Sequence, residues 1–138
     1  MTASNATSTA NDTSRQQDPE VIVYCDGAGS RPDGKGSGFA WIIPETREQH
    51  IERVDGLTNN QAEYRALISA LTAIPHGSVA RVFTDSQLVW SQVAGNYRAH
   101  DPALSDLLDQ VRTLIKDRHL KIDLQWVPRS KNVAGKLL

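Results

Sequence analysis

The sequence predicts an α/β fold, built as a mixed five-stranded sheet with helices on both faces. The first observation is a set of three short apolar runs, at residues 21–26, 38–44 and 50–54, whose short links favour an antiparallel meander. The second is that helical and strand-like segments alternate over the rest of the chain. This alternation is typical of crossover connections in sheets that contain parallel strands.

The meander is assigned from local composition. Residues 21–26 form a continuous apolar run and are predicted to be a buried strand. Residues 27–38 contain five glycines and are predicted to be a turn region. Residues 38–44 are the second strand, and the alternation in residues 50–54 indicates a weaker third strand.

The middle of the chain is assigned from its periodicity. Residues 60–74 are predicted to form a helix because apolar residues recur there at helical spacing. Thr58 or Asn59 is expected to cap the start of this helix. A strand at residues 79–84 follows, and then a helix at about residues 86–94.

The last part of the chain contributes one more helix and one more strand. Asp101 followed by Pro102 marks a helix start, because proline is favoured at the first helical position. The apolar stripe of this third helix is Leu104, Leu107, Leu108, Val111, Leu114 and Ile115. Residues 120–127 alternate as a last strand, and residues 133–138 are compatible with the start of a terminal helix.

Composition narrows the class of protein. The chain has 138 residues with 15 Lys and Arg against 16 Asp and Glu, which argues against a strongly basic nucleic-acid coat. A single cysteine, Cys25, gives no disulfide framework and favours a reducing compartment. The sequence has no membrane-length apolar stretch and no signal-peptide pattern. We therefore expect a cytoplasmic monomer with no membrane association and no obligate protein partner.

The first residues differ in composition from the rest. Residues 1–18 are mostly small and polar and lack apolar periodicity, so we expect a disordered tail. Residues 19–138 are then the folded catalytic domain.

Three acidic residues are expected to meet at one edge of the sheet. Asp26 ends the first strand, Asp85 follows the strand at 79–84, and Glu63 lies on the apolar stripe of the first helix. If the two strands run parallel side by side, their carboxyl ends lie about 5 Å apart. Clustered carboxylates repel each other, and hard divalent cations that prefer oxygen ligands relieve that repulsion. Such a cluster can hold two cations roughly 4 Å apart, which suits phosphoryl displacement.

Each acid also has a purely structural interpretation. Asp26 before Gly27 is common in ordinary turns, and Asp85 precedes a helix that it could cap. Asn60 and Glu63 have the spacing of a capping box. The sequence alone leaves these interpretations open.

Four segments carry a resemblance to a known family. Residues 24–28, 58–67, 84–89 and 126–132 resemble, in this order and spacing, the motifs of type 1 ribonucleases H. The resemblance implies a ribonuclease H-like fold and an endonuclease that cuts the RNA strand of RNA–DNA hybrids with two Mg²⁺ or Mn²⁺ ions.

The resemblance also implies roles for individual residues. Asp26, Glu63 and Asp85 match three catalytic, metal-binding carboxylates of the family. The residues that match its hybrid-binding positions are Gly27, Ala28, Gly29, Thr58, Asn59 and Asn60. Small residues and amides beside the metals suit a hybrid that is recognised by its groove shape and its 2′-hydroxyl groups.

The sequence departs from the family after Asp123, because no further Asp or Glu follows. The family has a fourth acid in a pattern similar to Asn-x-x-Ala-Asp, whereas Asn132 is followed by Val-Ala-Gly-Lys. We expect the Asn132 amide oxygen to be a metal ligand at that position, with water or an acid in a longer protein as other candidates for the ligand, and loop or helix capping as the structural alternative for Asn132. Arg129 stands in the loop where many members carry a histidine.

Two other functions are compatible with these features. The lost acid allows a module that binds hybrids with weak or no turnover. A transposase or integrase core shares the fold, but the Thr-Asn-Asn-x-Ala-Glu motif at residues 58–63 argues against it.

Overall fold

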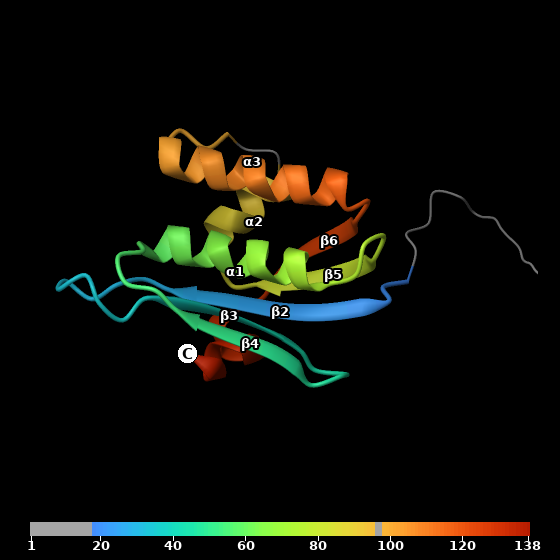
Figure 1. Cartoon of the computed structure of the whole chain (residues 1–138), viewed down its shortest axis with the longest axis horizontal. Coiled ribbons are helices and arrows are strands. Elements are labelled where there is room, and N and C mark those ends of the chain that lie inside the picture. Colours follow the sequence, from blue (N-terminus) through green and yellow to red (C-terminus); the bar gives the residue numbers. More distant parts are fainter. Residues whose placement is uncertain (1–17, 96–97) are drawn as a thin grey trace, which may run out of the picture.

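The computed structural model describes residues 18–95 and 98–138, so the predicted tail lies outside the described residues except for Asp18. Five strands form one mixed sheet in the order β4-β3-β2-β5-β6 (Figure 1). The strands are β2 (Val21–Ala28), β3 (Gly38–Ile43), β4 (Glu48–Arg53), β5 (Val79–Thr84) and β6 (Lys121–Trp126). Strands β2, β3 and β4 form the predicted antiparallel meander, and β5 pairs in parallel with both β2 and β6. The predicted α/β sheet is confirmed.

The helices lie mainly on one side of this sheet. They are α1 (Asn59–Ala73), α2 (Gln87–Val93) and α3 (Pro102–Asp117). Figure 1 shows all three above the sheet, with α1 along β2 and α3 stacked on α1. The 3₁₀ helix η2 (Val133–Leu137) packs against β2 and β3 from the other side. The second face is therefore covered by a short 3₁₀ element, not by a terminal α-helix.

Two strands, β2 and β4, start or end two residues away from the predicted bounds. Strand β2 continues through Gly27 and Ala28, which pair with Phe39 and Gly38, although glycines at its end indicated a turn. Strand β4 begins at Glu48, two residues before the predicted start. In both cases ladder hydrogen bonds to the neighbouring strand outweigh weak local propensity.

Helix α1 is fixed on the sheet by the core. Its buried side chains, including Tyr64, Leu67 and Leu71, pack with the buried residues Val23 and Cys25 of β2 in one hydrophobic cluster. Because α1 is held against β2 over its whole length, the position of Glu63 relative to the end of β2 is set by the fold.

None of the helices in the described part of the chain combines the length and the hydropathy that a membrane-spanning segment requires.

Candidate metal centre

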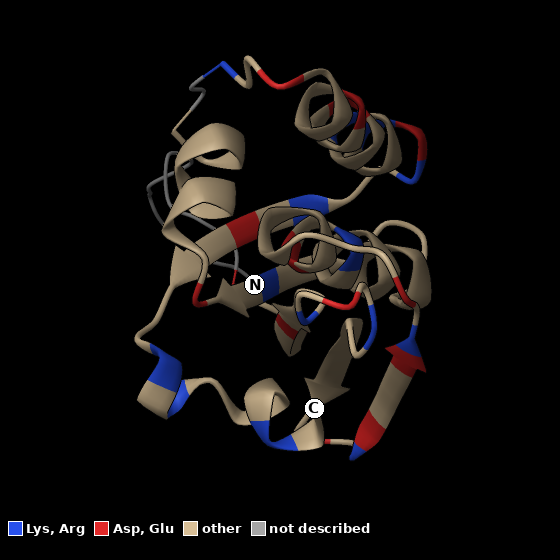
Figure 2. Ribbon diagram, turned by 90° about the vertical axis from the view of Figure 1, so that its left-hand side faces the viewer, with Lys and Arg blue, Asp and Glu red and all other residues tan. Residues whose placement is uncertain are grey.

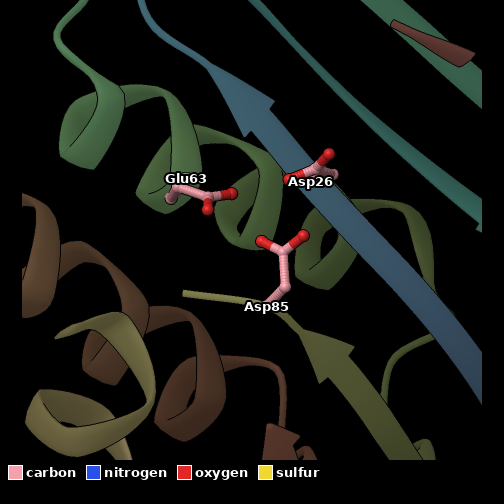
Figure 3. Close-up of side chains that lie close together, drawn as sticks. All are labelled: Asp26, Glu63 and Asp85. Atoms are coloured by element: carbon pink, nitrogen blue, oxygen red, sulfur yellow. The ribbon is translucent and has the colours of Figure 1, made fainter. Parts of the chain in front are cut away.

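The three predicted acids converge on one point. Asp26 comes from β2, Glu63 from α1, and Asp85 from the residue that follows β5 (Figure 3). One carboxylate oxygen of each lies within 4.8 Å of the others. The parallel pairing of β2 with β5 brings Asp26 and Asp85 together, as the sequence predicted.

Asp85 is turned toward this cluster because its neighbours take over the local hydrogen bonds. Ser86 caps α2, since its Oγ accepts from Val89 N at 3.1 Å, and Thr84 Oγ1 accepts from Ser86 N at 3.1 Å. The indole of Trp126 donates to the Asp85 backbone carbonyl at 3.1 Å. The capping interpretation of Asp85 is therefore wrong.

One oxygen of the Asp85 carboxylate is available to bind a ligand from outside the chain. Among the described residues, Asp85 Oδ2 is buried and has no hydrogen-bond partner. Leaving a buried polar atom unpaired costs about 1–3 kcal/mol or more. A bound divalent cation supplies the missing partner, and carboxylate oxygens are the donors that hard cations prefer.

Glu63 is held by the end of β2. Its Oε1 accepts from Gly27 N at 2.7 Å, and the same amide lies 3.0 Å from Asp26 Oδ1. The capping box of α1 is formed instead by Thr58 and Gln61, whose side chains each accept from the other's backbone N–H. The proposed capping role of Glu63 is thus wrong, and its carboxylate serves the cluster.

Two glycines make the close approach of α1 and β2 possible. A Cβ on Gly27 would lie 2.2 Å from the Ala62 carbonyl carbon, and one on Gly29 would lie 2.4 Å from Asn59 N. No side chain fits at those distances. The family resemblance predicted that both glycines bind the substrate. The structure adds a second role, because their lack of a side chain lets the Gly27 amide reach Glu63.

The negative charges of the three carboxylates repel each other. Burial, followed by the charge of Asp85, raises the pKa of the Asp26 carboxyl. Burial, followed by the charges of Asp26 and Asp85, raises the pKa of Glu63. The pKa of the Cys25 thiol is also raised, mainly by its burial and then by Glu63, so this cysteine is not a nucleophile. Positive charge from outside would stabilise the site.

A cavity of about 550 Å³ opens beside Asp26. Its lining residues are Asp26, Gly27, Ala28, Asn59, Arg129, Ser130, Asn132, Gly135, Lys136 and Leu138. The residues predicted to bind the substrate have different surroundings in the structure. Asn59 lies on the wall and its Oδ1 accepts from Gly29 N at 2.8 Å, Asn60 is exposed in the first turn of α1, and Thr58 is engaged in capping.

Comparison with known proteins decides the family. The family model described as RNase H matches residues 18–135. The chain belongs to the RNase H family. It is 32% identical over 120 residues to the bifunctional protein Rv2228c of Mycobacterium tuberculosis. This match covers 82% of this chain and 32% of that protein. It is equally similar, 32% over 120 residues, to a ribonuclease H of Polynucleobacter asymbioticus, with 78% of this chain and 75% of that protein covered. The chain thus spans about a third of the length of the mycobacterial relative.

Solved structures of RNase H proteins share the fold. The N-terminal RNase H domain of Rv2228c superposes with a TM-score of 0.71 at 30% identity, covering 86% of this chain and 91% of that one. LC11-RNase H1, solved in complex with an RNA/DNA hybrid, gives 0.73 at 26% identity, covering 86% and 93%. The resemblance to type 1 ribonucleases H is confirmed.

Asn132 has a structural position in this RNase H-family chain. It is buried, with 4% of its surface exposed. Its Nδ2 donates to the Cys25 backbone carbonyl at 2.9 Å, and its Oδ1 accepts from Ala134 N at 3.2 Å, which caps η2. Of the alternatives that the sequence left open, these bonds favour capping. The role of metal ligand remains a prediction.

Trp126 has a role at the site that its sequence pattern did not indicate. Trp126 pairs with Thr84 in the β5–β6 ladder, which places its indole beside the carbonyl of Asp85. The alternating pattern of residues 120–127 predicted the strand that carries Trp126. The sequence did not show which strand this one pairs with.

The raised pKa values predict how the stability of the metal-free protein depends on pH. A carboxyl whose pKa is higher in the folded than in the unfolded state binds more protons when folded, so stability falls as pH rises. We expect the melting temperature in EDTA to fall from about pH 4, the ordinary range of Asp and Glu, toward alkaline pH. Asp26→Asn should flatten this dependence, and thermal melts from pH 5 to pH 9 measure it. An identical slope in wild type and variant would contradict the cause assigned here.

Proposed function

We propose that this protein hydrolyses the RNA strand of RNA–DNA hybrids and requires divalent metal ions to do so. The observation that carries the proposal is the convergence of Asp26, Glu63 and Asp85, with a buried oxygen of Asp85 unpaired among the described residues, in an RNase H-family fold. The LC11-RNase H1 neighbour was solved with an RNA/DNA hybrid, which supports the same substrate here.

The three carboxylates would hold Mg²⁺ or Mn²⁺, and we propose two ions. When bound, such ions supply an activated water and stabilise the leaving 3′-oxygen. The chain fixes the ligands in place: the amide of Gly27 orients Glu63, and the indole of Trp126 orients the backbone of Asp85. These contacts restrict the positions of two of the three proposed ligands.

Hybrid recognition is assigned to the two sides of this cluster. On one side lies the cavity beside Asp26. There, the side chains of Asn59 and Asn60 and the backbone of residues 27–29 are suited to reading the groove and the 2′-hydroxyl groups. On the other side, a second cavity of about 690 Å³ is lined by residues that include Trp90, Trp126 and Arg98. Exposed indoles and a guanidinium suit stacking and phosphate contacts with the other strand.

The alternative is a module that binds hybrids with weak or no turnover. The observation that favours it is the engagement of both amide atoms of Asn132, which leaves three carboxylates in the cluster. The two proposals share the substrate and differ only in metal-dependent cleavage.

A cleavage assay tests the proposal directly. We expect a labelled RNA–DNA hybrid to be cut in its RNA strand with Mg²⁺ or Mn²⁺, and cutting to stop in EDTA. Single-stranded RNA and duplex DNA should remain intact under the same conditions. Cutting that persists in EDTA, or equal cutting of duplex DNA, would contradict the proposal. Binding of the hybrid without cleavage would establish the alternative.

We also propose that the protein works in the reducing environment of the cytoplasm. The support is its single buried cysteine.

A further inference from the structure

The cavity beside Asp26 has walls of opposite charge. Strand β2 contributes the carboxylate of Asp26, whereas the C-terminal segment contributes the cations Arg129 and Lys136. Figure 2 shows these basic positions in blue on the two short helices near the C-terminus, η1 (Arg129–Lys131) and η2. Two positively charged side chains therefore line the same cavity as Asp26, one of the three proposed metal ligands.

The wall that carries Lys136 is packed directly against Asp26. A Cβ on Gly135 would lie 3.0 Å from Asp26 Oδ2, so the backbone of η2 passes close to this carboxylate. The segment is anchored at both ends. Asn132 is bonded to the Cys25 carbonyl, and Arg53 Nη2 donates to the Leu138 carbonyl at 3.1 Å. Lys136 thus extends from a fixed backbone beside the cluster.

The ammonium of Lys136 has no partner of its own within the part of the chain that the structure describes. Its side chain is exposed, and the ion pairs found among the described residues join Arg31 with Asp33, His50 with Glu52, and Arg81 with Asp123. An exposed ammonium at the edge of a cavity is available to bind an anion that enters this cavity. The anion that the proposed substrate brings to this cavity is a backbone phosphate.

We propose that Lys136 binds a phosphate of the RNA strand in the cavity beside Asp26. This inference rests on the proposed function, because it assumes that the hybrid enters this cavity. Lysine binds phosphate as a compact point charge on a flexible stem, and that stem spans the gap between η2 and a strand lying along β2. The contact holds the RNA next to Asp26 and offsets the repulsion between its phosphates and the carboxylates.

The test is binding of a fluorescently labelled RNA–DNA hybrid in EDTA at low salt, measured by anisotropy. Lys136→Ala should weaken binding about tenfold, the effect of one charged hydrogen bond. The slope of log Kd against log salt should fall by about one, as for a single lost phosphate contact. Lys136→Arg should retain most of the affinity, because it keeps the charge.

Lys116→Ala is the matched control. It removes the same charge from the exposed last turn of α3, whose end contacts the C-terminal end of α1, far along that helix from Glu63. It should leave affinity and salt slope unchanged. With Mg²⁺, Lys136→Ala should raise KM for the hybrid and alter kcat much less.

Two outcomes would overturn the inference. If Lys136→Ala binds the hybrid with the affinity and slope of wild type, Lys136 is not a phosphate ligand. If Lys116→Ala weakens binding equally, the effect is one of net charge. Failure of the proposed function looks different, because the wild-type protein itself would then leave the hybrid uncut with Mg²⁺ or Mn²⁺, whether or not it binds it.

Discussion

Asp85→Asn is expected to lower hybrid cleavage roughly a thousandfold and to raise the melting temperature of the metal-free protein. The loss of activity is expected because a neutral amide would remove one of the three proposed charged metal ligands, and metal stabilisation of such a reaction is worth several kcal/mol. The measurement is kcat with Mg²⁺ and with Mn²⁺ for wild type and variant.

The gain in stability has a separate cause. Asp85 repels Asp26 and Glu63, and this repulsion contributes to the raised pKa values of both. An amide at position 85 removes that repulsion and adds a donor where Oδ2 is buried and has no partner among the described residues. Relief of about 1 kcal/mol would raise the melting temperature by roughly 3–6 °C in a domain of this size. Saturating Mg²⁺ should stabilise the wild type more than the variant.

Asp109→Asn is the control, since it makes the same change on the exposed surface of α3. Its kcat and melting temperature should match those of wild type. Near-wild-type turnover of Asp85→Asn would remove Asp85 from the metal site. A lowered melting temperature in EDTA would show that its carboxylate has a structural role.

Glu63→Gln separates charge from position within the same cluster. A glutamine Oε1 can still accept from Gly27 N, so the tie between α1 and β2 survives while the negative charge is lost. Loss of activity in a variant that remains folded would therefore assign the effect to the charge of Glu63.

The convergence of the three acids was predictable because it depends on rules that act along the sequence. Apolar periodicity places Glu63 on the buried face of a helix, and Asp26 and Asp85 each follow a strand. A parallel pairing of these strands then brings their ends together. No detail of side-chain packing is needed for this step.

Other features depend on contacts that no local pattern encodes. The need for glycine at position 27 comes from the Ala62 carbonyl on a different element, and Trp126 meets Asp85 only once β5 and β6 have paired. The terminal segment forms a 3₁₀ helix, an element common in short pieces, where periodicity alone was compatible with an α-helix.

Asn132 is the clearest case of this kind. Its side chain bonds to Cys25, which is 107 residues earlier in the chain. A sequence shows the residue type that can cap a helix or ligate a cation, but only this distant contact shows which atom faces which partner.

Asn132→Ala is therefore expected to destabilise the protein by about 2–3 kcal/mol, because it deletes a cap and leaves the Cys25 carbonyl without its donor in a buried position. A side chain that only ligated a metal would give a different result, with lost turnover and an unchanged melting temperature in EDTA. Melting curves with and without Mn²⁺, together with kcat, distinguish the two roles.

Asn132→Asp distinguishes the two roles further, because a carboxylate can keep only one of the two hydrogen bonds that the Asn132 side chain makes. A carboxylate can still accept from Ala134 N, but it cannot donate to the Cys25 carbonyl and would face that oxygen with a negative charge. If Asn132 is a cap and a tether, the variant should melt at a lower temperature than wild type in EDTA. If the side chain instead reaches the metals, the added carboxylate should raise Mn²⁺ affinity and preserve kcat, with little loss of stability. Lower stability without tighter Mn²⁺ binding would leave Asp26, Glu63 and Asp85 as the side-chain carboxylates of the described site, and any further metal ligand would then come from water, the substrate phosphate or an acid in a longer protein.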